Sequence, residues 1–271
     1  MGQLDGFLDR PGSRIAFADH GGRGRPIVLT HGAGMDHRMY DDQVRALSAA
    51  GFRPIVWDLR GHGESTLVGR RFTAEDAVGD LKALLASIGT EGAVLVGHSL
   101  GGNLSQAVIR EAPLAAHGLV VIDASWNAGP LSAIERFALR IAAPSLAMVP
   151  ARVLPGLMAR ASATTPAAVA RTEEVFARMP KRVFLDVWRA TASLIAPEPG
   201  YRTPIPVGLM RGAEDRTGNI STAMPAWADA EGVVEHVIAG AGHIVTWDAP
   251  DAASTALLRI LDGAAFRGRA S

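Results

Sequence analysis

Short apolar runs rich in β-branched residues alternate along this chain with longer segments of helical spacing, and this alternation constrains the fold more than any other feature. We expect strands at 14–19, 26–30, 54–57, 93–96, 119–122, 205–209 and 233–238. We expect helices around 40–49, 73–88, 100–111, 219–230 and 250–262. Such alternation is typical of a mostly parallel sheet with helices on both faces, and ligands bind these sheets at the carboxyl ends of the strands. The sequence therefore predicts an α/β fold with a site at that edge.

One long segment breaks the alternation. Residues 125–203 are rich in Ala, Leu, Met, Arg and Pro at helical spacing and contain no convincing strand. Because a proline ends or kinks a helix, we expect several short helices here. The prolines that would divide them are Pro144, Pro150, Pro155, Pro166 and Pro180. We therefore predict a core domain of residues 1–124 and 204–271, with a helical cap of residues 125–203 inserted before the strand at 205–209.

The composition excludes several classes of function. Basic and acidic residues balance at 27 each among 271 residues, which argues against nucleic acid or an anionic membrane as a partner. The absence of Cys excludes disulfides, thiolate metal sites and a cysteine nucleophile, and it fits a cytoplasmic protein. No apolar run reaches the roughly 18 residues that a membrane span needs, and no pair of histidines has metal-ligand spacing. We expect no membrane span, no metal and no cofactor, and composition makes no prediction of oligomeric state.

The stretch VLVGHSLGG at 94–102 marks a candidate nucleophile. Ser99 lies in a G-x-S-x-G pattern between an expected strand and an expected helix. Gly97 and Gly101 would let the strand and the helix approach closely, while the serine is held in a strained backbone with its oxygen exposed. The start of the following helix would also direct free N–H groups toward a developing oxyanion. We therefore predict that Ser99 is a catalytic nucleophile.

A serine nucleophile needs a base and an acid from elsewhere in the fold. His243 follows the last expected strand in a glycine-rich loop, and we predict that it is the general base. Asp215 follows the strand at 205–209 and is the predicted acid that orients the imidazole. Asp123, at the end of the neighbouring strand, is the alternative acid, and Glu214 is a weaker candidate. The order serine, acid, histidine is the order found in α/β-hydrolases.

The same edge of the sheet would supply oxyanion donors and a pocket. The run HGAG at 31–34 follows a strand, and the expected donors are the backbone N–H groups of Ala33 and Leu100. The residues next to the catalytic positions are mostly apolar, which predicts a hydrophobic substrate. The expected pocket residues are Met35, Trp126, Trp188 and Ile244, with Phe137, Leu146, Met148 and Trp247 as further candidates.

Taken together, these motifs resemble the α/β-hydrolase superfamily, in particular its capped esterase, lactonase and haloperoxidase-like branch. They stand in the family's order as HG at 31–32, DLRGHGES at 58–65, GHSLGG at 97–102, G-x-x-D at 212–215 and GH at 242–243. The resemblance implies that the loop at 58–65 braces the nucleophile strand, with structural roles for Asp58, Arg60 and His62. It also implies that the insertion occupies the position of the family's lid.

The resemblance implies a serine hydrolase that cleaves a small, largely hydrophobic carboxylic ester or lactone through an acyl-enzyme. Relatives that open epoxides or remove halide use a carboxylate at the position of Ser99, so the serine argues against both reactions. Two alternatives stay open. One is hydrolysis of a carbon–carbon bond or cofactor-free peracid formation on the same three residues. The other is a ligand-binding protein that keeps the fold without turnover.

Overall fold

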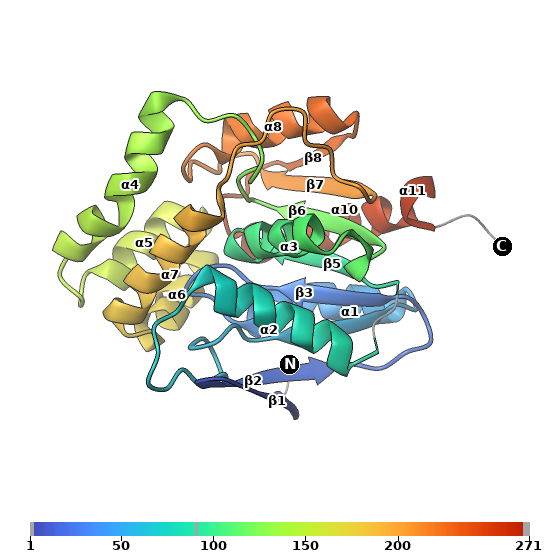
Figure 1. Cartoon of the computed structure of the whole chain (residues 1–271), viewed down its shortest axis with the longest axis horizontal. Helices are drawn as coiled ribbons and strands as arrows, with labels where there is room; N and C mark the ends of the chain where they lie inside the picture. The colour runs from blue at the N-terminus through green and yellow to red at the C-terminus, as the bar shows by residue number, and fades with distance from the viewer. Residues whose placement is uncertain (1–2, 90–91, 268–271) are drawn as a thin grey trace.

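The computed structural model describes residues 3–89 and 92–267. Within these residues the chain forms an eight-stranded sheet in the order β1-β2-β4-β3-β5-β6-β7-β8. The first two strands form an antiparallel hairpin, β2 pairs with β4 antiparallel, and the strands from β4 to β8 pair in parallel. The predicted fold class, a mostly parallel sheet between helices, is confirmed (Figure 1). The ends of the predicted core domain, residues 1–2 and 268–271, lie outside the described residues.

Apart from β1, which was not predicted, the strands lie close to their predicted positions. Their bounds are β1 (Gly6–Arg10), β2 (Ser13–Asp19), β3 (Pro26–Thr30), β4 (Arg53–Trp57), β5 (Val94–His98), β6 (Gly118–Ile122), β7 (Val207–Gly212) and β8 (Glu235–Ile238). Successive side chains of a strand point to opposite faces of the sheet. In β5, Val94 and Val96 therefore join one buried cluster while Leu95 joins the other. Continuous apolar runs are what a sheet covered on both faces requires.

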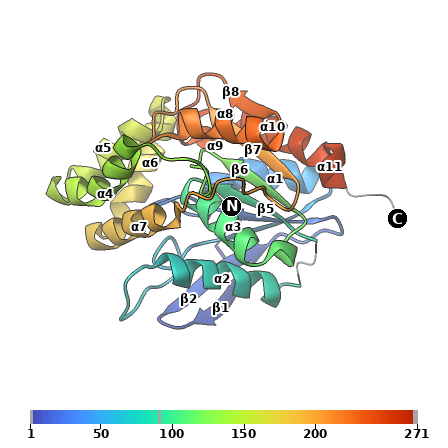
Figure 2. The ribbon, with the colours of Figure 1, turned by 45° about the horizontal axis from the view of Figure 1, so that its top comes forward.

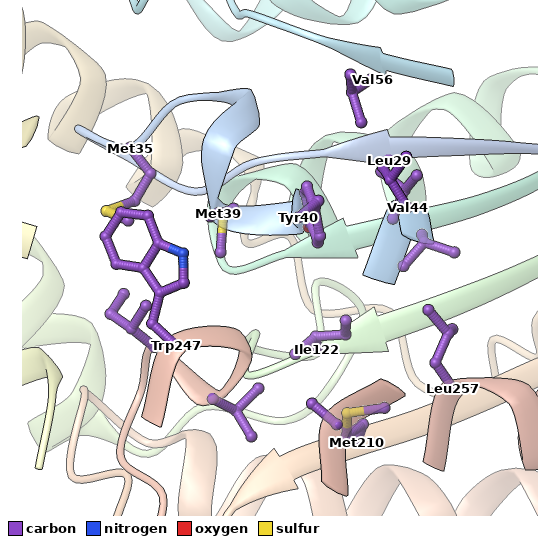
Figure 3. Close-up of a cluster of buried hydrophobic side chains, with 14 of the residues drawn as sticks. Leu29, Met35, Met39, Tyr40, Val44, Val56, Ile122, Met210, Trp247 and Leu257 are labelled. Carbon is purple, nitrogen blue, oxygen red and sulfur yellow. The ribbon is translucent and has the colours of Figure 1, made fainter. Parts of the chain in front are cut away.

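Helices of the core cover both faces. Their bounds are η1 (His37–Tyr40), α1 (Asp41–Ala49), α2 (Ala74–Ser87), α3 (Leu100–Glu111), η2 (Pro113–Ala115), α8 (Ile220–Glu231), α9 (Val245–Asp248), α10 (Pro250–Asp262) and α11 (Ala264–Arg267). On one face α1 and α10 pack against the sheet through residues such as Val44 and Leu257 (Figure 3). On the other face α2, α3 and α8 do so through Leu81, Leu104 and Trp227.

Between β6 and β7 the chain forms four further helices among the described residues, which we call the inserted helices. They are α4 (Ala133–Met148), α5 (Leu154–Ser162), α6 (Pro166–Arg178) and α7 (Lys181–Leu194). Together they lie beside one end of the sheet, at the carboxyl ends of the parallel strands (Figures 1 and 2). This placement brings them next to the loops that carry the predicted catalytic residues.

Of the five prolines expected to divide the insertion, three mark helix starts, Pro150 lies between α4 and α5, and Pro144 does neither. Pro155 and Pro166 lie in the first turns of α5 and α6, and Pro180 directly precedes α7. Pro144 instead lies inside α4, so the prediction that it ends a helix is wrong. A proline inside a helix leaves the carbonyl four residues earlier without its partner. Because Arg140 and Pro144 are both exposed, water can bind that carbonyl and the helix continues.

No helix in the described part of the chain is both long enough and apolar enough to cross a bilayer.

Candidate active site

Ser99 occupies a strained turn between β5 and α3. Its backbone angles are φ 50° and ψ −118°, and among the described residues only one other non-glycine residue has a positive φ. Strain of this kind costs about 1–3 kcal/mol and persists only where the surroundings enforce it. Here a Cβ at Gly97 would overlap the backbone of Gly101, and one at Gly101 would overlap the carbonyl of Thr30. The two glycines therefore allow the close approach that holds the serine in this conformation, as the sequence predicted.

His243 and Asp215 are joined by a buried hydrogen bond. The imidazole Nδ1 lies 2.9 Å from Oδ2 of Asp215, and both side chains are almost fully buried. The other oxygen, Oδ1, accepts a hydrogen bond from the N–H of Thr217 at 2.8 Å. Burial by itself raises the pKa of the Asp215 carboxyl, but the His243 charge and these hydrogen bonds outweigh it and hold the pKa well below its usual range. Asp215 is therefore a carboxylate that can orient the imidazole and stabilise its charged form.

Ser99 and His243 line the same cavity, which has a volume of about 160 Å³. Apolar side chains from the inserted helices form much of its wall, and Met35 and Ile244 add to it from the core. The cavity-lining residues are Ala33, Met35, His98, Ser99, Met158, Ala161, Ser162, Phe176, Phe184, Trp188, Thr191, Arg216, Thr217, His243 and Ile244. Ser99 and His243 thus line one largely apolar cavity, and Asp215 is connected to it through its hydrogen bond to His243.

Asp123, the alternative acid, has a different environment from Asp215. Its carboxyl is fully buried at the end of β6, its φ is 45°, and Oδ1 accepts the N–H of Gly212 at 2.8 Å. Burial and the neighbouring Asp215 charge raise its pKa well above the usual value. A carboxyl that keeps its proton cannot stabilise an imidazolium by charge, so the geometry and the electrostatics both favour Asp215 as the acid.

Asp123, Asp215 and His243 are also the described residues best placed to hold a metal ion, since their ligand atoms lie within 4.8 Å of one another. A resident metal would have to compete with the bond between His243 Nδ1 and Asp215. Because the Asp123 carboxyl keeps its proton, it does not repel the ionised carboxylate of Asp215 as a second negative charge would. Hydrogen bonding between His243 and Asp215 thus accounts for the proximity of two of these three residues.

His98 contacts the predicted base directly. His98 directly precedes Ser99 and lines the same cavity. Its Nε2 lies 2.7 Å from the backbone carbonyl of His243, and the two rings are 4.8 Å apart. Burial lowers the pKa of His98 to about 3, so the ring is neutral, and Nε2–H donates to that carbonyl. The bond ties the strand before the nucleophile to the loop that carries the base.

The predicted oxyanion donors both belong to residues near Ser99, since Leu100 directly follows it and Ala33 lines the same cavity. Neither the N–H of Ala33 nor that of Leu100 has an acceptor among the described residues. Leu100 is the first residue of α3, where N–H groups have no partner within the helix. Its side chain is buried in the core, and only its N–H can serve the site. Ala33 lines the cavity.

The loop at 58–65 braces the segment that carries Ala33. His62 Nε2 accepts the N–H of Gly34 at 3.2 Å, and burial lowers the pKa of His62 to about 3, so that nitrogen is free to accept. Asp58 accepts the backbone N–H of His37 at 2.7 Å. The family resemblance implied support for the nucleophile strand, whereas these contacts reach the loop after β3. Arg60 is bound instead to Asp80 of α2.

Of the four pocket residues predicted from the sequence, Met35, Trp188 and Ile244 line the cavity and Trp126 does not. Trp126 stacks on Trp227 of α8, with ring planes 2° apart and centroids 6.0 Å apart. Trp126 points away from the cavity because the next residue is bound to α3: the N–H of Asn127 donates to the side chain of Gln106 at 2.8 Å. This contact turns the chain away from the cavity.

The further candidates also lie elsewhere. Phe137 and Met148 are exposed on α4, Leu146 packs against the core cluster, and Trp247 is buried beneath Arg171. The sequence analysis missed the cavity residues Met158, Phe176, Phe184, Thr191, Arg216 and Thr217. For the last two a signal existed, because they directly follow Asp215 and must lie near it.

Asp248 ties the inserted helices to the loop of His243. Its carboxylate accepts the N–H of Thr164 at 2.9 Å and the N–H of Thr165 at 2.8 Å, both from the turn between α5 and α6. It also accepts the N–H of Gly242 at 2.9 Å, directly before His243. In addition, the N–H of Ile244 donates to the carbonyl of Ser162 at 2.9 Å. The base and this part of the insertion therefore form one hydrogen-bonded unit.

Comparison with known proteins agrees with this architecture. The chain is 39% identical over 93 residues to the non-heme chloroperoxidase CPO-A1 of Kitasatospora aureofaciens, and 35% identical over 94 residues to the bifunctional esterase/perhydrolase DCH of Acinetobacter calcoaceticus. Each match covers 34% of this chain and 34% of the relative, so the chain matches about a third of the length of these curated proteins.

Over nearly the whole length, the structure is similar to that of a thermophilic esterase from Thermogutta terrifontis. The TM-score is 0.78 at 25% identity, covering 96% of this chain and 97% of the other. The family model of the Alpha/beta hydrolase family matches residues 27–256. This range includes all three predicted catalytic residues and the inserted helices. The chain belongs to the alpha/beta hydrolase family.

Proposed function

We propose that the protein is a serine hydrolase that cleaves a carboxylic ester or lactone of a small, largely hydrophobic substrate through an acyl-enzyme. One observation carries the proposal. Ser99, in a strained turn, shares a cavity with His243, whose Nδ1 is bound to the buried carboxylate of Asp215. Nucleophile, base and orienting acid are the groups that acyl transfer to serine requires.

In the proposed mechanism His243 removes the Ser99 proton as the serine oxygen attacks the carbonyl carbon. Asp215 stabilises the imidazolium that forms, and the N–H groups of Ala33 and Leu100 bind the oxyanion. The imidazolium then protonates the leaving alcohol, and the acyl group remains on Ser99. A water molecule, deprotonated by His243, attacks this acyl-enzyme and releases the acid, which restores the serine hydroxyl. In a lactone the leaving alcohol stays attached to the acyl group.

We also propose that residues 125–203 act as a cap over this cavity. Met158, Phe176, Phe184 and Trp188 come from α5, α6 and α7 and line the space above Ser99. Apolar walls around a few convergent polar groups suit a hydrophobic acyl or ring-bearing substrate. They also exclude water, which strengthens the electrostatic stabilisation of the oxyanion.

A second candidate function, peracid formation, is favoured by the names of the relatives. One is called a non-heme chloroperoxidase and another an esterase/perhydrolase. The same acyl-enzyme would serve, with hydrogen peroxide in place of water as the attacking group, which gives a peracid and free Ser99. Hydrolysis of a carbon–carbon bond beside a ketone and ligand binding without turnover are the remaining alternatives.

Turnover of a substrate panel tests the proposal. The panel contains p-nitrophenyl esters of short and medium acyl chains, aliphatic lactones, a vinylogous diketone, and acetate with hydrogen peroxide. We expect ester or lactone hydrolysis to have the highest kcat/KM, and Ser99→Ala to lower it by at least about 10⁴-fold. Ester turnover that survives Ser99→Ala at full rate would contradict the proposal. If the diketone or peracid formation has the higher kcat/KM, the proposed function would be replaced by carbon–carbon bond hydrolysis or by peracid formation, respectively.

A further inference from the structure

We propose that Arg216 binds a carboxylate of the substrate, so that the natural substrate is an ester or lactone whose acyl part carries a second, ionised carboxyl group. This inference rests on the proposed function and narrows its substrate class. The cavity that contains Ser99 and His243 is largely apolar, yet Arg216 also lines it. Among the lining residues that the structure describes, it is the only Asp, Glu, Lys or Arg.

Arg216 has no partner of its own. Among the described residues no hydrogen bond or ion pair involves its side chain, which is exposed. The exposed Arg160 of α5 likewise has none among these residues, whereas three other arginines around the same end of the sheet are paired. Arg211 binds Glu235 at 2.9 Å, Arg171 binds Asp41 at 3.1 Å, and Arg38 binds Asp36 at 2.6 Å. A guanidinium carries five N–H donors in a fixed plane that matches a carboxylate in a bidentate pair. The donors of Arg216 are thus free for a ligand.

The position of Arg216 is fixed relative to the catalytic residues. It directly follows Asp215, and the N–H of Thr217 donates to that carboxylate at 2.8 Å. The backbone on both sides of Arg216 is therefore held by the same group that binds His243. A carboxylate bound by this guanidinium would orient the rest of the substrate toward Ser99, which is how a remote contact contributes to the rate of a reaction.

The approach to the cavity also carries positive charge. A neighbouring cavity of about 440 Å³ shares Ala161, Ser162 and Arg216 with the catalytic one. Arg160 and Glu214 line this outer cavity as well, so two arginines face one glutamate there. Focused positive potential raises the rate at which an anionic ligand enters a cleft. The outer cavity is accordingly a route by which a monoanionic substrate reaches Arg216.

A single free guanidinium beside an apolar wall favours one carboxylate over a doubly charged phosphate. A phosphate group typically recruits several donors from backbone N–H groups or from more than one cation. Within the described residues, the catalytic cavity offers one cation and a wall of Met, Phe, Trp and Ile side chains. This combination suits a short hydrocarbon chain or ring with an ester at one end and a carboxylate at the other.

A matched pair of esters tests the inference. The p-nitrophenyl monoester of adipic acid and p-nitrophenyl hexanoate have the same chain length and differ in the terminal carboxylate. We expect the wild-type kcat/KM for the acidic ester to exceed that for the neutral ester, and Arg216→Gln to lower this ratio by about tenfold. Arg216→Lys, which keeps the charge but not the planar fork, should give an intermediate ratio. The preference should also weaken as ionic strength rises.

Arg182→Gln is the matched control, because Arg182 is exposed on α7 and lines none of the cavities described here. It should leave the ratio unchanged. An Arg216→Gln variant with the wild-type ratio, in an enzyme whose ester turnover depends on Ser99, would overturn the carboxylate site while the proposed function stands.

Binding provides a readout that needs no turnover. In the Ser99→Ala background, we expect monomethyl adipate to bind more tightly than methyl hexanoate by calorimetry, and Arg216→Gln to remove this difference. If the protein hydrolyses no ester but keeps the Arg216-dependent difference in binding, the carboxylate site stands and the proposed function fails. Equal affinities with and without Arg216 would overturn the site.

Discussion

The carboxyl edge of the sheet and the outer inserted helix α4 differ sharply in how firmly their side chains are held. At the sheet edge Ser99, Asp215 and His243 are each buried or locked by backbone contacts that come from several strands. In α4, among the residues the structure describes, Ala143 alone is buried, and Ile134, Phe137 and Met148 are largely exposed. Reaction chemistry needs geometry held within about half an ångström, whereas substrate recognition tolerates a wall that adjusts.

Between these extremes lie α5, α6 and α7. The turn between α5 and α6 is bound to the core through Asp248, and α6 and α7 pack aromatic side chains onto the core. Phe176 and Phe184 are buried and contact each other edge to face, with centroids 5.8 Å apart. We infer that the insertion has an inner part, which belongs mechanically to the site, and an outer helix that does not. Substitutions placed along this gradient should lose effect with distance from the sheet edge.

Among the substitutions that test this comparison, the largest effect is expected at Asp215, the predicted acid. Asp215→Asn removes the charge that stabilises the imidazolium and presents an amide to His243 Nδ1, so we expect kcat to fall by on the order of 10³-fold or more. Asp123→Asn should stay within a few-fold of wild type, because an asparagine can accept the Gly212 N–H and donate toward Asp215 as the protonated acid does. Steady-state kinetics on one ester compares the two variants. The reverse ranking would assign the acid role to Asp123.

The same substitution, Asp123→Asn, should also change how the free energy of unfolding depends on pH. The folded protein keeps this carboxyl protonated at pH values where the unfolded chain, with a pKa near 3.8, has lost the proton. The folded state therefore binds more protons, and its stability falls as pH rises above that value toward the raised folded pKa. We expect Asp123→Asn to have the higher free energy of unfolding, by a margin that widens from pH 4 to pH 8. Urea unfolding at several pH values would show an unchanging or narrowing margin if Asp123 is ionised in the fold.

A smaller loss is expected at the junction with the insertion. Asp248→Ala leaves the N–H groups of Thr164, Thr165 and Gly242 without their acceptor, which loosens the loop of His243 as well as the turn between α5 and α6. We expect kcat/KM to fall by about tenfold and amide exchange to rise in both segments. Asp229→Ala, at an exposed aspartate of α8, is the control. Faster amide exchange in only one of the two segments would contradict the claim that Asp248 couples the loop of His243 to the turn between α5 and α6.

The smallest effect is expected on α4. Phe137→Ala removes an aromatic ring that is 61% exposed, so activity and the free energy of unfolding should both stay close to wild type. Phe184→Ala on α7 removes a ring that is 5% exposed and lines the cavity, and we expect a loss of about 3–5 kcal/mol in stability with a raised KM. Thermal unfolding and kinetics of both variants check this contrast. Comparable losses at the two positions would contradict the division of the insertion.

Local sequence signals were sufficient for the fold class and for the placement of the predicted catalytic residues at one edge of the sheet. The helices at 100–111 and 250–262 have the predicted bounds, because proline or a glycine-flanked turn marks their starts. Ser99, Asp215 and His243 each follow a strand, so a parallel sheet brings them to one edge. The direction of a loop side chain, in contrast, depends on contacts with residues that are distant in sequence. Trp126 turns toward α8 because Asn127 is bound by residues of α3 that are distant in sequence.

The lining of the cavity was the least predictable part, since it depends on which faces of α5, α6 and α7 turn toward the core. Apolar spacing on a helix marks a buried face but does not distinguish a cavity wall from solid packing. The free guanidinium of Arg216 is likewise a tertiary property. Among the described residues Glu214 lies on the same outer cavity but forms no ion pair with Arg216, and no local sequence pattern encodes which nearby charges pair.

The most direct test of the account is the site of reaction with a fluorophosphonate, which labels serines activated by a base. Peptide mapping by mass spectrometry should find the adduct on Ser99, and His243→Gln should slow its formation by orders of magnitude while the protein stays folded. An adduct on another residue, or labelling of Ser99 at the same rate without the imidazole of His243, would contradict the proposed coupling of nucleophile and base.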